Sequence, residues 1–166
     1  MLELFRRYII NKRTRLIYKK YILKKSNNQN DDLFYSIKSF GLKNKNKTFY
    51  VINRSPGAGI FSNLTFVLNF ILVSKKKNFI PIIDMDNFPT IYNEKKKIFN
   101  FSNAWNYYFE SLNKYSLDEV YKSKNVYFSN SLFEKKMSLD MTNKKLRNQF
   151  KKIRIKNKLI QKANNF

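Results

Sequence analysis

A chain of 166 residues can form one domain with a hydrophobic core, but it is too short for two domains of ordinary size. Its 43% content of hydrophobic residues excludes wholesale disorder, and the absence of cysteine and histidine excludes disulfides, thiolate metal sites and histidine acid–base chemistry. The net charge of +23 indicates either a polyanionic partner, such as nucleic acid or anionic lipid, or a lysine-rich codon bias with solvated basic faces. Because most of the 34 basic residues are lysine rather than the bidentate arginine, nucleic acid is the least favoured of these.

The amino-terminal segment, residues 1–32, is predicted to be a basic helix over 1–25 followed by a polar linker. An apolar stripe could run along this helix, formed by Phe5, Ile9, Leu16 and Leu23. The stripe fits either anionic lipid, through apolar insertion and charge, or the chain's own domain. No apolar run has the length of a signal-peptide core or of a membrane span. We therefore expect a cytoplasmic protein, with residues 1–25 as its candidate contact with the inner face of the membrane.

The middle of the chain has the clearest pattern. Residues 48–54 (TFYVINR) and 79–85 (FIPIIDM) have the length and the β-branched, aromatic composition of strands. Residues 60–77 between them have helical length and are apolar on nearly all sides, so they should be buried against a sheet. Strand, glycine turn, helix and strand form a βαβ unit. Residues 33–141 are therefore predicted to be an α/β, three-layer Rossmann-like domain with a parallel sheet.

The flanking segments complete this domain. Residues 33–47 indicate a short helix that ends at Gly41, with a lysine-rich loop beyond it. The sequence SLDE at 116–119 is a capping box that opens a short helix, and residues 125–130 are a third candidate strand. Residues 142–166 are predicted to be a second basic helix, so that the domain is flanked by basic terminal helices. The apolar stripe of this second helix would consist of Leu146, Phe150, Ile153 and Ile160.

The sequence SPGAG, between the first strand and the buried helix, holds two of the three glycines in the chain. A glycine turn at a helix start presents backbone N–H groups and the positive end of the helix dipole, and it lets a ligand approach closely. In an open α/β sheet, ligands usually bind at this edge. The turn lacks the third glycine of a dinucleotide fingerprint and the Gly-Lys-Ser/Thr of a P-loop, so a phosphate or sugar site and a structural turn both stay open. The candidate contacts are Arg54, Gly57, Gly59, Ser62 and Asn63.

A pair of carboxylates, Asp84 and Asp86, follows the second predicted strand. Two carboxylates at this spacing after a strand can hold a divalent cation against the diphosphate of a nucleotide-sugar. Aspartate also commonly ends a strand because it makes turns, and a polar contact without a metal is a third interpretation. The turn is the most favoured of the three.

An aromatic cluster, residues 103–110 (NAWNYYFE), contains the only tryptophan of the chain. Trp105 and Tyr108 could offer ring faces to the C–H side of a sugar, although core packing is the commoner fate of such residues. Glu110 is the best carboxylate candidate for a general base, against the alternative of a solvated loop residue.

A family resemblance is carried by three segments in this order: VINRSPGAGIFSNLTFVLNFIL, FIPIIDMDNFPTIYNE and NAWNYYFE. Over about residues 48–130, the chain resembles the amino-terminal half of bacterial fucosyltransferase-like glycosyltransferases, which are related to the O-fucosyltransferase and nodulation-type α-1,6-fucosyltransferase superfamily. The resemblance implies a GT-B architecture, with two Rossmann-like domains facing across a cleft, a GDP-sugar donor, a glycan acceptor, and no metal or other cofactor. It further implies that Asn63 and the backbone of Gly57, Ala58 and Gly59 contact the sugar. The segment 105–110 would line the acceptor side.

The chain departs from this family in one respect. The second domain of the family carries an arginine-centred motif, of the form His-Phe-Arg-Gly-Thr-Asp, that grips the donor diphosphate, and no such segment occurs here. We therefore expect a fragment or a truncated protein, in which residues 142–166 lead towards a missing domain and activity alone is in doubt. The alternative hypothesis is a non-enzymatic basic module that binds nucleic acid or anionic membrane.

Overall fold

The computed structural model describes residues 37–53, 59–129 and 144–157, and every structural statement refers to these residues. They form an α/β fold around a sheet with the strand order β1-β4-β2-β3. Three strands run parallel, and a two-residue strand pairs antiparallel with β4 at one edge. The predicted α/β class with a parallel sheet is confirmed. The strands are β1 (Ile37–Lys38), β2 (Lys43–Asn53), β3 (Ile80–Asp84) and β4 (Ser123–Phe128).

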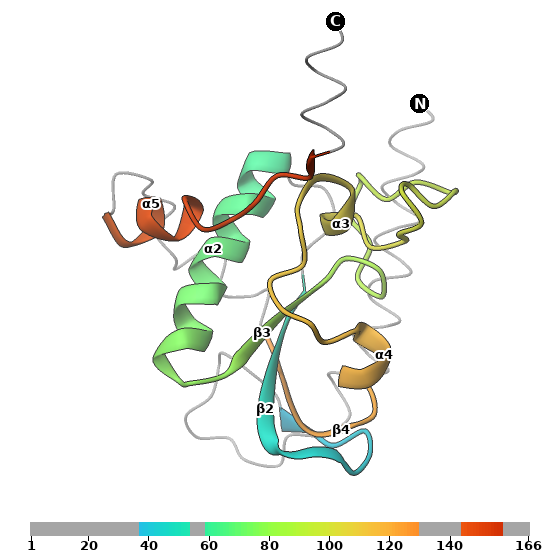
Figure 1. Ribbon diagram of the computed structural model, residues 1–166, viewed down its shortest axis with the longest axis vertical. Helices are drawn as coiled ribbons and strands as arrows, with labels where there is room; N and C mark the ends of the chain where they lie inside the picture. The colour runs from blue at the N-terminus through green and yellow to red at the C-terminus, as the bar shows by residue number, and fades with distance from the viewer. Residues whose placement is uncertain (1–36, 54–58, 130–143, 158–166) are drawn as a thin grey trace, which may run out of the picture.

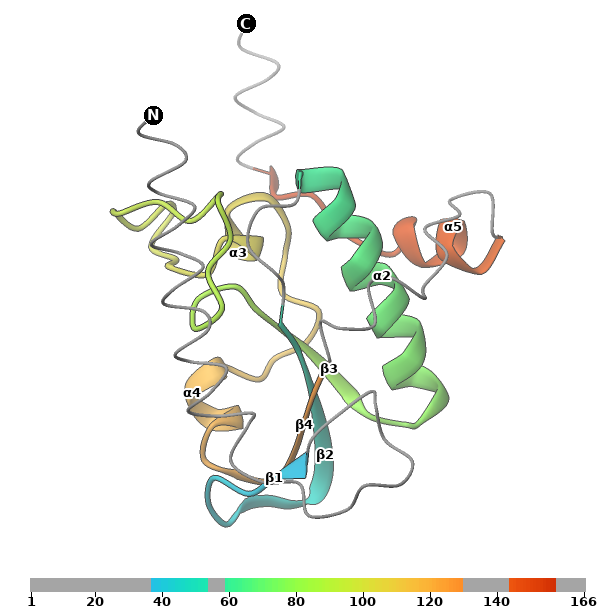
Figure 2. The same cartoon turned by 180° about the vertical axis from the view of Figure 1, so that it is seen from behind.

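The helices cover the sheet from both sides (Figures 1 and 2). Helix α2 (Ile60–Lys76) connects β2 to β3, as predicted, and α5 (Lys144–Phe150) packs against it. The opposite face carries α4 (Leu117–Val120), whose amino end is capped by the predicted capping box. A third short helix, α3 (Trp105–Tyr108), lies between β3 and α4 in the chain.

Strand β2 is the centre of the core because it lies between β4 and β3. Its residues 49–52 are fully buried, and their side chains alternate between the two faces. Tyr50 and Ile52 join the hydrophobic cluster under α2, while Phe49 and Val51 join the cluster on the α4 face. A strand buried on both faces has no polar side to alternate with, which explains its continuous apolar run.

The two crossovers of the sheet run in opposite directions. The chain passes from β2 to β3 across one face through α2, and then from β3 to β4 by a longer connection that reaches the other face with α4, although its residues 104–109 pack in the cluster under α2. Opposite faces are expected when each parallel crossover is right-handed. The carboxyl ends of β2, β3 and β4 consequently meet at one edge of the sheet, the upper edge in Figure 1.

The short helix predicted to end at Gly41 is wrong where the structure describes it, from residue 37 onward. Residues 37–38 are strand β1, and the expected lysine-rich loop is the first half of β2. Pairing with β4 determines this outcome, since the Lys43 N–H donates to the Lys122 carbonyl (3.1 Å). Gly41 does not end a helix. A Cβ at Gly41 would lie 2.5 Å from the Lys122 carbonyl oxygen, so the close approach of two backbones requires glycine there.

The helix predicted over 142–166 is interrupted within its described part, residues 144–157, while residues 142–143 and 158–166 lie outside the described residues. Helix α5 ends at Phe150, and the chain then turns so that Ile155 forms an antiparallel bridge with Phe109. Residues 1–36 lie outside the described residues, so the basic helix predicted over 1–25 stays a prediction. Within the described parts of the chain, no helix combines the length and apolar character needed to cross a membrane.

Candidate functional site

The carboxyl edge of the sheet is closed by polar side chains that bond to one another. The Asn53 N–H, at the end of β2, donates to the hydroxyl oxygen of Ser129, just beyond β4 (3.0 Å). That hydroxyl donates in turn to the Asn53 side-chain oxygen. Both residues are buried, so this pair ties the ends of β2 and β4 together.

Asp84, at the end of β3, is fully buried and makes the turn that the sequence favoured for it. Its carboxylate accepts from the backbone N–H groups of Asp86 (3.1 Å) and Asn87 (2.8 Å), and from the Asn87 side chain (3.0 Å). It also accepts from the Tyr121 hydroxyl (2.6 Å). Burial raises the pKa of Asp84, while these hydrogen bonds act in the opposite direction. Its oxygens are therefore already engaged by the protein.

The glycine turn is described only in part. Arg54, Gly57 and Ala58 lie outside the described residues. Gly59 occupies the N-cap position of α2 with φ −61° and ψ 160°, a conformation that any residue adopts, and no atom lies within 4 Å of a Cβ placed there. Conformation therefore does not require glycine at this position, and the space beside it is open. Ser62, in the first turn of α2, is half-buried.

Asn63, Trp105 and Tyr108, three of the predicted site residues, do converge. They line one cavity between the start of α2 and the segment around α3, which we call the α2 cavity. Its volume is only about 10 Å³, room for about one water molecule. Trp105 is 3% exposed and Asn63 is 1% exposed, so both belong to the interior. Burial raises the pKa of the Tyr108 hydroxyl, helped by the nearby Glu94, which favours a neutral hydrogen-bond donor.

Glu110, the predicted general base, lines neither of the cavities described here. Its carbonyl accepts from the Trp105 indole N–H (3.2 Å), and its own N–H donates to the Arg154 carbonyl (3.0 Å). The backbone of Glu110 thus joins the aromatic cluster to the segment that follows α5.

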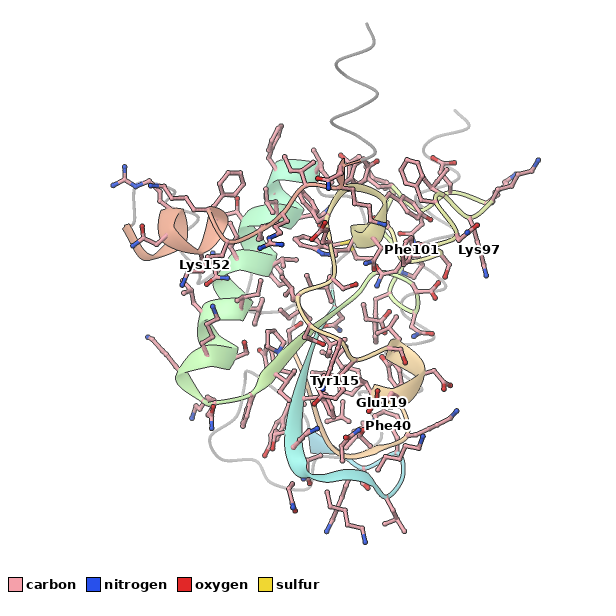
Figure 3. The ribbon with its side chains drawn as sticks, in the orientation of Figure 1. Phe40, Lys97, Phe101, Tyr115, Glu119 and Lys152 are labelled. Carbon is pink, nitrogen blue, oxygen red and sulfur yellow. The ribbon has the colours of Figure 1, made fainter. Side chains whose placement is uncertain are left out.

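A second and much larger hollow, the β3 groove, has a volume of about 360 Å³ and runs beside β3. Its walls come from β3 and from residues 100–117. Two of its aromatic residues, Phe101 and Tyr115, are labelled in Figure 3, where Phe101 lies nearer the end at which α2 begins and Tyr115 lies nearer α4. Its polar lining consists of Asp86, Asn100, Ser102, Asn103, Asn106, Ser111, Asn113, Lys114 and Ser116.

The groove exists because side chains, rather than another strand, cover the outer edge of β3. The Asn113 side-chain amide donates to the Pro81 carbonyl (2.7 Å), and the Asn103 amide donates to the Ile83 carbonyl (2.7 Å). The Met85 N–H donates to the Asn103 side-chain oxygen (3.3 Å). Pro81 suits this edge because it has no N–H to present.

Asp86 is the only acid among the described residues that line the β3 groove. Its carboxylate accepts from the Ser102 hydroxyl (2.8 Å), which fixes its position in the wall. On the same groove, the Asn106 amide donates to the Ser111 hydroxyl (3.0 Å). The lining therefore offers both donors and acceptors, with little net charge.

Sequence reasoning weighed Asp86, with Asp84, as a turn, a metal ligand or a metal-free polar contact, favoured the turn, and missed Ser111 and Asn113. The signal was the pair of polar residues Ser111 and Asn113 directly after the aromatic cluster. In the described parts of the chain, no three acidic, histidine or cysteine side chains gather closely enough to hold a metal ion.

A comparison of the chain with protein-family models, curated proteins and solved structures finds no match in any of the three.

Proposed function

We propose that this chain is the acceptor-side domain of a fucosyl-type glycosyltransferase, and that a glycan binds in the β3 groove. The observation that carries the proposal is the lining of this groove, in which neutral amides and hydroxyls stand beside aromatic rings and a single carboxylate. The groove's volume of about 360 Å³ lies within the ordinary range of small-molecule sites.

The polar lining suits a sugar better than a phosphate. Each sugar hydroxyl both donates and accepts, which matches the paired donor and acceptor groups of asparagine and serine. A diphosphate would require clustered cations or free backbone N–H groups, whereas Lys114 is the only basic residue in the described lining. The ring of Tyr115 and that of Phe101 offer apolar faces for the C–H side of the sugar.

The proposed reaction is a direct displacement at the anomeric carbon of a GDP-sugar. A hydroxyl oxygen of the acceptor forms the new bond to that carbon, while the bond to the diphosphate oxygen breaks and GDP leaves with the electron pair. In this proposal Asp86 replaces Glu110 as the base that takes the proton of the attacking hydroxyl, because Asp86 lines the groove and Glu110 does not. No metal or other cofactor is required by this scheme.

Titration calorimetry of the full chain with mono- and disaccharides, GDP and GDP-fucose tests the proposal. Saccharides should bind, and Asp86→Asn should weaken them by about tenfold to a hundredfold, the worth of a hydrogen bond to a charged group. Asp118→Asn is the matched control, since Asp118 is an exposed carboxylate that contacts Lys122 away from the groove. Equal affinities for Asp86→Asn and the wild-type chain, or no saccharide binding at all, would contradict the proposal.

A turnover assay separates binding from transfer. Because transfer also requires a donor-binding domain, the assay uses a protein that carries both domains; its release of GDP from GDP-fucose with a bound saccharide should fall in Asp86→Asn and persist in Glu110→Gln. If release falls in Glu110→Gln and persists in Asp86→Asn, Glu110 rather than Asp86 is the base.

A further inference from the structure

Exposed apolar side chains gather at the carboxyl end of the sheet. Phe61, in the first turn of α2, is 79% exposed, Ile155 is 51% exposed and Phe101 is 40% exposed. Exposure of such side chains to water is unfavourable, and several of them at one end of a molecule indicate an interaction surface. A comparable residue at the opposite end is Leu42, which is 72% exposed just before β2.

These residues come from distant parts of the chain, and contacts link the segments that carry them. The Lys156 ammonium lies 3.6 Å from the centre of the Phe101 ring, and the Lys156 N–H donates to the Tyr108 carbonyl (3.0 Å). Tyr108 in turn lines the α2 cavity together with Ile60, the neighbour of Phe61. Figures 1 and 2 both show the start of α2, residues 153–157 and the loop after β3 at the same end of the molecule.

Basic residues surround these apolar groups. The consecutive lysines 95–97 are exposed, and Figure 3 shows Lys97 and Phe101 at the same end of the molecule. Arg154 and Lys156 add two further cations beside Ile155. Among the described residues, the acids of this end are the fully buried Asp84, Asp86, which bonds to Ser102 in the groove, Glu94 beside the lysines, and the half-buried Glu110. Cations therefore outnumber acids, and they stand next to apolar side chains.

We propose that this carboxyl face, formed by Phe61, Phe101, residues 95–97 and residues 154–156, lies on an anionic lipid bilayer. Phenylalanine and isoleucine side chains can enter the boundary between headgroups and acyl chains, while neighbouring lysines meet the lipid phosphates. Nucleic acid fits less well, because Ile155 has no ring on which a base could stack and lysine outnumbers arginine here. The inference does not rest on the proposed function, although Phe101 belongs both to this face and to the lining of the β3 groove.

Sedimentation of the full chain with vesicles tests the charge component. The chain should bind vesicles of phosphatidylcholine with phosphatidylglycerol and should bind pure phosphatidylcholine weakly. The triple variant K95Q/K96Q/K97Q should lose about tenfold or more in partitioning, since each lysine at the surface contributes appreciably. The matched control K43Q/K45Q/K47Q removes the same charge from exposed lysines at the amino end of β2 and should partition like the wild-type chain.

A second pair of variants tests the apolar component. Phe61→Ser should reduce partitioning several-fold, whereas Leu42→Ser, an equally exposed site at the opposite end, should leave it unchanged. Thermal melting of each variant verifies that it is folded. An equal loss in both triple variants would show attraction by net charge alone, and no loss in either would place the contact elsewhere, as in residues 1–25. Either result, or binding of duplex DNA with indifference to vesicles, would overturn the proposal.

Discussion

The α2 cavity and the β3 groove share Trp105 as a wall, yet their volumes differ greatly. The α2 cavity has about 10 Å³, room for about one water molecule, whereas the β3 groove has about 360 Å³. The α2 cavity occupies the place where ligands usually bind in an α/β sheet, at the start of the helix after the first parallel strand. Aromatic and aliphatic side chains fill that place here, such as Trp105, Leu64 and Phe109. The difference shows that a fold indicates where a site is usual, whereas the volumes of the side chains determine where one remains open.

Trp105→Ala should have the largest effect, because it removes the wall between the two hollows. Trp105 is almost fully buried, and its ring centre lies 4.4 Å from that of Phe109. We expect a loss of about 3–5 kcal/mol in the free energy of unfolding, measured by urea denaturation. Phe101→Ala, a partly exposed residue of the groove, should cost less than about 1 kcal/mol. Similar losses for the two variants would mean that Trp105 is not a core residue.

Tyr121→Phe tests whether the end of β3 is a closed turn rather than a ligand site. Removing the hydroxyl that donates to Asp84 (2.6 Å) should lower the free energy of unfolding by about 1.5–3 kcal/mol at a pH where Asp84 is ionised, as for hydrogen bonds to charged groups.

The pH dependence of this variant follows from the sign of the shift. Burial raises the pKa of Asp84 above its usual 3.8, so this residue lowers stability as the pH rises from that value through the raised pKa. The Tyr121 hydrogen bond counteracts this rise in the pKa of Asp84. Its loss should therefore lower the free energy of unfolding most where Asp84 is ionised and least in acid. Urea denaturation at neutral and at acidic pH measures this. A loss that does not change with pH would contradict the bond to an ionised carboxylate.

Asn113→Ala removes a side chain that covers the edge of β3 and should have a smaller effect. It loses the bond to the Pro81 carbonyl (2.7 Å) and leaves that carbonyl to water, at a cost of about 1 kcal/mol in the free energy of unfolding. Asn46→Ala, at an exposed position of β2, is the control and should change stability by less than about 0.5 kcal/mol. Chemical denaturation of both variants decides whether Asn113 supports the groove wall.

Gly59→Ser should have the smallest effect on stability. It tests whether a ligand binds at the glycine turn before α2 rather than in the β3 groove. Gly59 is at the N-cap of α2 without a side-chain cap, and a serine there should raise stability by a few tenths of a kcal/mol. Saccharide binding in the β3 groove should not change. If binding falls in calorimetry while thermal stability rises, the ligand lies at the turn and the groove is the wrong site.

The parallel sheet could be predicted because its βαβ unit carries its own signals. The continuous apolar run of β2, the helix after the glycines and the run IPIID of β3 are local patterns, and the structure confirms each of them. The strand at Lys43 could not be predicted, since KNKNK has no strand pattern and becomes a strand only through pairing with β4. Its partner is about 80 residues away, beyond the reach of local reasoning.

The site was predicted less well for the same reason. Residues 53, 84 and 129 meet at one edge as strand ends do in a parallel sheet, so a polar cluster there was foreseeable. Whether Trp105 faces a ligand or the core depends on packing against α2, and composition does not decide between the two. The groove depends on the hydrogen bonds that the Asn103 and Asn113 side chains donate to β3 carbonyls. These bonds join residues 20 and 32 positions apart, and sequence spacing does not predict them.

The amides of Asn103 and Asn113, which bond to carbonyls of β3, also affect how the protein associates with other chains. An edge strand with free carbonyls invites a neighbouring chain to add itself as the next strand, which is how many β-rich proteins aggregate. Here Pro81 and the side chains of Asn103 and Asn113 make that edge a poor template, although no other strand of the described residues pairs with it. The protein can therefore keep the β3 groove open beside its sheet without exposing an edge to which the strand of another chain would readily pair.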